Sequence, residues 1–184
     1  MRSKKIVITG GPGTGKTSII NELKNQNYYC FDEIIRELTL EAKNNIGADS
    51  QISNPIAFVN DPLEFNTKLL NGRLNQFKQA AALKKPLVFF DRGIPDVLAY
   101  MDFFNQEYNN DFLKVCDTNR YSHIFLLPPW ESIYKSDNER FETFKEAVKI
   151  HEALKQVYKN LAYNIIEVPF GTIENRTDFI INNI

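Results

Sequence analysis

The sequence predicts an α/β fold, with a five-stranded parallel sheet between two layers of helices. Three observations favour this fold class. Short, almost continuous apolar runs alternate with segments of helical period along the chain. A glycine-rich segment follows the first apolar run, and acidic residues follow two of the later runs. In an open parallel sheet such residues meet at the carboxyl ends of the strands, where ligands bind.

Strands that are buried on both faces of a parallel sheet are short and apolar throughout. The predicted strands are Lys5–Thr9, Tyr28–Phe31, Leu87–Phe90, His123–Leu127 and Ile165–Val168. The predicted helices are Lys16–Asn25, Glu33–Asn45, Leu63–Lys84, Pro95–Asp117, Asn138–Ala162 and Ile173–Asn183. Since the chain contains no internal repeat or flexible linker, we expect residues 1–184 to form one domain.

The first predicted strand leads into Gly10–Thr17, which fits the G-x-x-x-x-G-K-[ST] pattern of a P-loop. Backbone N–H groups of such a loop, together with the following helix N-terminus, bind phosphate. We expect Lys16 to reach the β- and γ-phosphates and the Thr17 hydroxyl to ligate Mg²⁺. The predicted nucleotide-binding residues are Gly11, Gly13, Thr14, Gly15, Lys16, Thr17 and Ser18. The motif predicts a P-loop NTPase sandwich that binds a nucleoside triphosphate.

The third predicted strand ends in the acid–arginine pair Asp91-Arg92. An apolar strand followed by an acid is the Walker-B pattern, so Asp91 is a candidate Mg²⁺ ligand opposite Thr17. Its alternative role is to cap the helix predicted from Pro95. Arg92 is expected to lie between the metal site and the acceptor and to hold phosphoryl oxygens. A purely structural ion pair is the alternative for Arg92.

Glu33 and Arg36 follow the second predicted strand and are one helical turn apart. If Glu33 lies across the cleft from Lys16, its carboxylate can take the proton of an acceptor hydroxyl. Arg36 would hold Glu33 or contact the substrate. The alternative is that an acid here only stabilises a helix N-terminus.

Two further segments are candidates for closing the site. Arg140 lies in the charged stretch Glu131–Arg140, and a mobile arginine on the transferring phosphate is common in phosphoryl transfer. A solvated charged surface is the equally weighted alternative. The segment Ile46–Pro62 combines helix-breaking residues with apolar ones, so it either covers the core or forms a wall of the substrate pocket.

The composition favours a cytoplasmic protein. The formal net charge of −1 gives no electrostatic argument for a nucleic-acid partner or an anionic membrane. No apolar run is long enough to span a bilayer, and no signal peptide is expected before the first strand. Cys30 and Cys116 lie in apolar surroundings and are expected to be reduced. A protein partner and the oligomeric state are left open.

The motifs together resemble a family of small P-loop proteins. They are Gly10–Thr17, Glu33-x-x-Arg36, Asp91-Arg92-Gly93-Ile94-x-Asp96, Asp137-x-x-Arg140 and Val168-Pro169…Arg176. The family is described as a predicted ATPase or AAA domain family, akin to the nicotinamide riboside kinase domain of NadR-type proteins. The resemblance implies a kinase-like fold with ATP and Mg²⁺. The arrangement is also similar to deoxynucleoside kinases, which implies Glu33 as general base, Arg92 as a clamp near the acceptor and Arg140 as a lid arginine.

The expected function is transfer of the ATP γ-phosphoryl group to a hydroxyl of a small nucleoside-like acceptor. The expected catalytic residues are Lys16, Glu33, Asp91, Arg92 and Arg140, and the expected acceptor-binding residues are Glu33, Arg36 and Arg92. GTP is disfavoured because Tyr134 stands where a guanine-binding motif has Asn or Thr. The alternatives are an ATPase that acts as a regulatory switch and an NTP-binding module without an acceptor.

Overall fold

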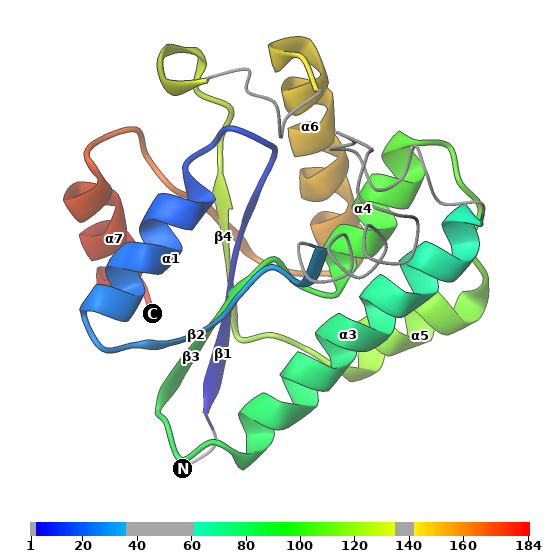
Figure 1. Cartoon of the computed structure of the whole chain (residues 1–184), viewed down its shortest axis with the longest axis horizontal. Coiled ribbons are helices and arrows are strands. Elements are labelled where there is room, and N and C mark those ends of the chain that lie inside the picture. Colours follow the sequence, from blue (N-terminus) through cyan, green and yellow to red (C-terminus); the bar gives the residue numbers. More distant parts are fainter. Residues whose placement is uncertain (1–2, 36–60, 135–141) are drawn as a thin grey trace, which may run out of the picture.

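The computed structural model describes residues 3–35, 61–134 and 142–184. Within these residues, five parallel strands form one sheet in the order β2-β3-β1-β4-β5. Figure 1 labels β1 to β4. The strands are β1 (Lys4–Gly10), β2 (Tyr29–Phe31), β3 (Leu87–Asp91), β4 (His123–Leu127) and β5 (Ile165–Glu167). This confirms the predicted fold class, and each strand lies within one or two residues of its predicted range.

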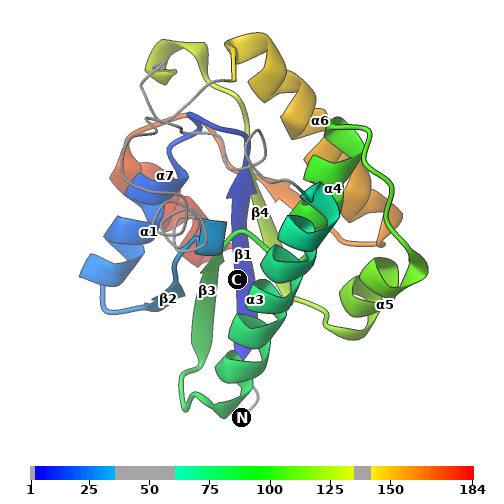
Figure 2. The same ribbon diagram turned by 45° about the vertical axis from the view of Figure 1, so that its right-hand side comes forward.

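Helices cover both faces of the sheet, because side chains of each strand point alternately to the two sides (Figures 1 and 2). One face of β1 packs Ile6 and Ile8 against α1 (Lys16–Asn25) and α7 (Ile173–Asn182). The other face buries Val7, with Phe90 of β3, against four further helices of the described ranges. These are α3 (Pro62–Ala82), α4 (Pro95–Phe103), α5 (Asn110–Thr118) and α6 (Phe144–Asn160). The result is the predicted three-layer arrangement.

Two helices have clear start signals in the sequence. Asp61 caps α3 by accepting hydrogen bonds from the N–H groups of Leu63 and Glu64, and Pro62 occupies the first turn. Thr143 and Glu146 form a capping box at the start of α6. The predicted helix Asn138–Ala162 was therefore too long at its N-terminus, because the capping box fixes the start at Phe144. Residues 138–141 lie outside the described part of the chain.

The prediction of one helix over Pro95–Asp117 was wrong, because two helices, α4 and α5, occupy this range. Asn105 adopts the left-handed conformation, with φ of 52°, which a continuing helix does not allow. The Asn109 side chain then accepts a hydrogen bond from the N–H of Asp111 and starts α5. Asparagine tolerates the left-handed conformation and also favours the N-cap position of a helix. The break lies in the stretch 105–109, which begins and ends with asparagine.

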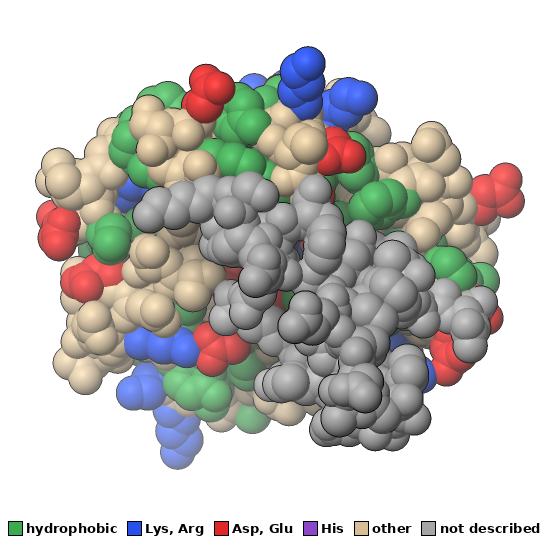
Figure 3. Space-filling view, turned by 45° about the horizontal axis from the view of Figure 1, so that its top comes forward, with side chains coloured by type: hydrophobic (Ala, Val, Ile, Leu, Met, Phe, Trp, Pro, Cys, Tyr) green, Lys and Arg blue, Asp and Glu red, His purple; other side chains and the backbone are tan. Residues whose placement is uncertain are grey.

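Several sequence expectations fall on residues that are not described. They are Arg36, Arg140, most of the predicted helix Glu33–Asn45, and all of Ile46–Pro62 except its last two residues. Elsewhere, charged side chains of both signs are interspersed on the face that Figure 3 presents. In the described ranges we find no helix with the length and hydropathy needed to cross a membrane.

Candidate functional site

The P-loop connects β1 to α1 at the carboxyl edge of the sheet. Gly13 and Gly15 have φ of 72° and 86°, values that non-glycine residues rarely adopt, so the loop conformation requires these glycines. The Thr14 hydroxyl donates a hydrogen bond to the Gly11 carbonyl over 3.0 Å, and Lys16 Nζ donates to the same carbonyl over 2.8 Å. The Lys16 side chain is thus already folded back over the P-loop.

Lys16 has an unusual pKa for a lysine. Burial lowers it from 10.5 to about 7, and the nearby positive charge of Arg92 acts in the same direction. The carboxylates of Asp91 and Glu33 oppose this shift but do not cancel it. An anion bound beside the ammonium would favour the charged form, so this lysine is suited to a phosphate ligand.

Asp91 is the last residue of β3 and pairs in register with Ile8 of β1, immediately before the P-loop. Its side chain is buried, and its Oδ1 atom has no hydrogen-bond partner in the described part of the structure. Burial raises the pKa of Asp91, and the negative charge of Glu33 is the second cause of this rise. A buried carboxylate oxygen that lacks a partner is chemically suited to a cation.

The residues present fit the Mg²⁺ ion that a P-loop implies. Thr17 lies in the first turn of α1 and is exposed, at the same carboxyl edge of the sheet as Asp91. No group of three or more potential metal ligands from His, Cys, Asp and Glu occurs among residues 3–35, 61–134 and 142–184. Mg²⁺ in kinases needs only one or two carboxylates, because phosphate and water complete its coordination.

Glu33 is held between two arginines. Its Oε1 lies 2.9 Å from Arg73 Nη2, and its Oε2 lies 2.5 Å from Arg92 Nε. All three side chains are largely buried, with 9% of Glu33, 3% of Arg73 and 12% of Arg92 exposed. The structure thus brings together two of the candidate acceptor residues, Glu33 and Arg92, and adds Arg73. The contact is the ion pair that was the alternative expected for Arg92.

Sequence reasoning missed Arg73, which reaches the site from the middle of α3. Arg73 also donates a hydrogen bond to the Gly93 carbonyl over 3.0 Å. The signal was present, because Arg73 shares one helix face with the buried residues Leu70 and Phe77. A charged residue in an otherwise apolar helical stripe needs a buried partner of opposite charge.

Arg92 connects the P-loop to Glu33. Its Nη1 atom donates to the Gly10 carbonyl over 3.2 Å and lies 3.3 Å from Asp96 Oδ1, while its Nε atom faces Glu33. The guanidinium also lies over the Tyr100 ring, 5.0 Å from its centroid. The backbone of Arg92 is left-handed, with φ of 74°. Such a conformation in a non-glycine residue costs free energy and is concentrated at functional sites.

An aromatic group lies beside the other flank of the P-loop. Arg176 of α7 donates from Nη1 to the Thr14 carbonyl over 3.1 Å and lies 5.8 Å from the Trp130 ring centroid. Trp130 in turn packs on Phe170, with 4.9 Å between ring centroids. Two nitrogen atoms of Arg176, Nε and Nη2, are buried and have no partner among the described residues. The sequence pattern alone gave no role to Trp130 or Phe170.

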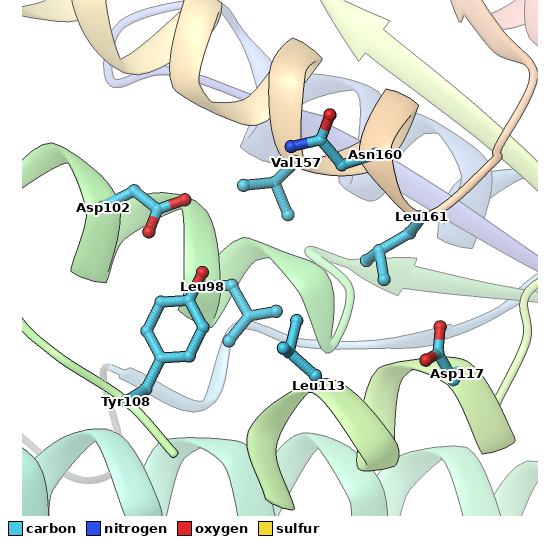
Figure 4. Close-up of a pocket in the computed structure, with 8 residues that line it drawn as sticks. All are labelled: Leu98, Asp102, Tyr108, Leu113, Asp117, Val157, Asn160 and Leu161. Carbon is cyan, nitrogen blue, oxygen red and sulfur yellow. The ribbon is translucent and has the colours of Figure 1, made fainter. Parts of the chain in front are cut away.

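A surface pocket of about 210 Å³ lies away from the P-loop, between α4, α5 and the end of α6 (Figure 4). The pocket residues are Leu98, Asp102, Tyr108, Leu113, Asp117, Val157, Asn160 and Leu161. None of them is a site residue predicted from the sequence. The pocket is therefore separate from the P-loop site.

Comparison with solved structures shows the fold of the whole chain. A NadR protein solved in complex with NAD and AMP-PNP has a TM-score of 0.70 at 18% identity over 98% of this chain and 48% of that one. Deoxyadenosine kinase from M. mycoides gives 0.65 at 18% identity over 97% of each chain. Thymidylate kinase from Candida albicans gives 0.67 at 16% identity over 99% of this chain and 91% of that one. The present chain spans about half the length of the NadR chain.

A search of curated proteins found no match. The model of a protein family described as "AAA domain" matches residues 5–176, which include the P-loop, Glu33, Asp91-Arg92 and Arg176. This confirms the family resemblance that the sequence motifs indicated. The chain belongs to this AAA domain family.

Proposed function

We propose that this protein is a P-loop phosphotransferase that moves the γ-phosphoryl group of ATP to a hydroxyl of a small, nucleoside-like acceptor. The observation that carries the proposal is the position of Glu33. Its buried carboxylate is joined through the Arg92 guanidinium to the Gly10 carbonyl of the P-loop. A regulatory nucleotide switch has no need of a second carboxylate held at this place, whereas a kinase needs one to receive the acceptor proton.

The donor half of the proposed site is the P-loop. The backbone N–H groups from Gly11 to Ser18 would bind the phosphates, and Lys16 would release the Gly11 carbonyl to pair with the β- and γ-phosphates. Thr17 and Asp91 would hold Mg²⁺, which neutralises phosphate charge when it is bound. The unpartnered Oδ1 atom of Asp91 supports this assignment.

The acceptor half consists of Glu33 and Arg92, with Arg73 behind them. Glu33 would accept the proton of the acceptor hydroxyl as the hydroxyl oxygen attacks the γ-phosphorus. The bond from the γ-phosphorus to the β–γ bridging oxygen would break, and ADP would leave. Arg92 would exchange part of its contact with Glu33 for the transferring phosphoryl oxygens, because its planar guanidinium can serve both. Arg73 would hold the Glu33 carboxylate in place. Arg36 and Arg140 stay sequence-based candidates for acceptor binding and for closing the site.

The structural relatives agree with this chemistry. One NadR structure with a TM-score of 0.71 and 17% identity was solved in complex with NR, and others are a deoxyadenosine kinase and a thymidylate kinase. Their acceptors define the panel to be tested, namely ribosides, deoxynucleosides and nucleoside monophosphates. We also propose a cytoplasmic location, since the two cysteines, Cys30 and Cys116, are free thiols.

The test is to incubate the protein with ATP, Mg²⁺ and each member of this panel, and to measure ADP and phosphorylated acceptor together. The proposal expects ADP formation that depends on one acceptor class and matches product formation one to one. An inactive Lys16→Met variant serves as the background control. Acceptor-independent hydrolysis at about one turnover per second would support the ATPase alternative instead.

A further inference from the structure

Asp96 of α4 is fully buried, and its carboxylate contacts the Arg92 guanidinium. Its Oδ1 atom accepts a hydrogen bond from the Thr9 hydroxyl over 2.5 Å, and its Oδ2 atom accepts one from the Tyr158 hydroxyl over 2.6 Å. The Gly93 N–H donates to Oδ2 over 3.0 Å, and Arg92 Nη1 lies 3.3 Å from Oδ1. A buried carboxylate with four polar partners is well stabilised.

These partners come from separate parts of the fold. Thr9 is near the end of β1, immediately before the P-loop, and Tyr158 is in the last turn of α6. Gly93 and Arg92 belong to the turn that follows β3. Asp96 therefore ties the P-loop strand, α6 and the arginine-bearing turn to one carboxylate.

The turn after β3 needs such support. Arg92 has a left-handed backbone, with φ of 74°, and its N–H donates to the Ile8 carbonyl over 3.0 Å. The next residue, Gly93, has no room for a side chain, because a Cβ atom there would lie 2.5 Å from Tyr158 Oη. Strained backbone persists only where surrounding contacts determine it, and here Asp96 and Tyr158 provide those contacts.

We propose that Asp96, fixed by Thr9 and Tyr158, is a positioning residue that holds the Arg92 guanidinium between the P-loop and Glu33. Asp96 does not touch the reactants itself, because it lies behind Arg92 and has no exposed surface. The proposal rests on the proposed kinase function for its catalytic consequence. Its structural half, the restraint of Arg92, can be measured without any acceptor.

The variants are Tyr158→Phe and Thr9→Val, which remove one hydroxyl each and keep the shape of the buried side chain. Tyr163→Phe is the matched control. It removes a tyrosine hydroxyl that accepts a hydrogen bond from the Tyr121 N–H over 3.2 Å, and its ring packs on that of Tyr158 at 5.5 Å between centroids. Thr9→Val provides a second test of the proposal if Tyr158→Phe is unstable.

The first readout is the rate of hydrogen exchange at Arg92 Nε, which NMR of the arginine side chains measures. The Arg92 signal is assigned by its absence in Arg92→Lys. We expect exchange at Arg92 to become about tenfold faster in Tyr158→Phe and Thr9→Val. Each variant removes a hydroxyl hydrogen bond that fixes the Asp96 carboxylate, which in turn contacts Arg92. Arg120, which donates hydrogen bonds to the Leu161 and Ala162 carbonyls, should keep its wild-type exchange rate in these two variants. Exchange at Arg92 should stay as in the wild type in Tyr163→Phe. An unchanged Arg92 exchange rate in both variants would overturn the proposal.

The second readout is a double-mutant cycle in the acceptor-dependent assay. We expect Tyr158→Phe to lower kcat about tenfold while the KM for ATP is unchanged, and to have no further effect in an Arg92→Lys background. An equal loss in both backgrounds would contradict action through Arg92. If the wild type shows no acceptor-dependent transfer, the kinase proposal fails, and the exchange measurement still decides the restraint of Arg92.

Discussion

The Arg92 guanidinium and the Glu33 carboxylate form a buried ion pair, with 2.5 Å between Nε and Oε2. Glu33 follows β2 and Arg92 follows β3, and these two strands are neighbours in the sheet. Since Arg92 also bonds to the Gly10 carbonyl, the pair links the P-loop to the position proposed for the acceptor. An acceptor hydroxyl that enters here meets a carboxylate that two arginines hold in place.

Arg73→Met should destabilise the protein by about 3 kcal/mol. The substitution removes one of the two positive charges that compensate the buried Glu33 carboxylate, and breaking a buried ion pair is strongly destabilising. Urea unfolding measures the effect. Lys68→Met on the same helix is the matched control, because Lys68 pairs with Glu64 on the surface and its loss should change stability little. Equal stabilities of the two variants would show that Arg73 only fills space.

Asp91→Asn should raise the melting temperature of the protein without nucleotide. The pKa of Asp91 is raised in the folded state, chiefly by burial, so the ionised form is disfavoured on folding. Stability is therefore lost as the pH rises above the usual carboxyl pKa, and the amide avoids this loss at pH 7. A gain of about 2–4 °C is expected for each kcal/mol recovered in a chain of this size.

The same variant should lose stabilisation by Mg²⁺ and ATP, because an amide is a poor magnesium ligand. Scanning calorimetry at pH 7 and near pH 4 gives both results, and the difference from the wild type should shrink at the lower pH. A lower melting temperature for Asp91→Asn at pH 7 would contradict the raised pKa of Asp91.

ATP affinity should fall as the pH rises above 7, because Lys16 has a pKa of about 7 and must be charged to pair with phosphate. The loss approaches about tenfold for each pH unit when binding requires the protonated form. Titration calorimetry between pH 7 and 9 measures it, with Lys16→Met as the variant whose affinity should lack this dependence.

The stability of the nucleotide-free protein should change in the opposite direction. Because the folded pKa of Lys16 lies below its usual 10.5, the unfolded chain binds more protons between about pH 7 and 10. Lys16 therefore contributes a rise in stability with pH over this window. If Lys16→Met and the wild type have parallel pH profiles, the lowered pKa is refuted.

Much of the fold and part of the site follow from the sequence because they depend on local patterns. The buried strands are recognisable as apolar runs, and the P-loop has a fixed spacing. Knowing the strands places Glu33, Asp91 and Arg92 at one edge of the sheet, since parallel strands share their carboxyl ends. The structure confirms this placement, whereas the catalytic roles of these residues stay predictions.

The parts of the fold and of the site that the sequence did not predict depend on tertiary contacts. The helix predicted from Pro95 to Asp117 breaks at Asn105, where a left-handed residue interrupts an otherwise helical pattern. Arg73 reaches Glu33 from a helix 40 positions further along the chain, and no local rule selects it. Asp96 was visible only as part of a family motif. Its hydrogen bonds to Thr9 and Tyr158 join residues that are 87 and 62 positions away.

Gly13→Ala should weaken ATP binding by at least about tenfold. Alanine is strained by roughly 1–2 kcal/mol at the φ of 72° found there, and its Cβ atom would lie 2.6 Å from the Tyr134 ring. Gly171→Ala is the matched control, because Gly171 also has a positive φ, 158°, but lies outside the P-loop, and a Cβ atom there meets nothing nearer than 3.6 Å. Equilibrium binding of a fluorescent ATP analogue to both variants checks the prediction. Equal affinities would show that the P-loop conformation does not need glycine at position 13.

The central claim is that Glu33 serves transfer to an acceptor and does not merely support the P-loop. The most direct measurement follows the label of [γ-³²P]ATP in wild type and Glu33→Gln, with the active acceptor present. The account predicts label in the acceptor for the wild type, a loss of at least about 100-fold in Glu33→Gln, and ATP affinity within a few fold of wild type. Label that appears only in inorganic phosphate, at the same rate in both proteins, would contradict it.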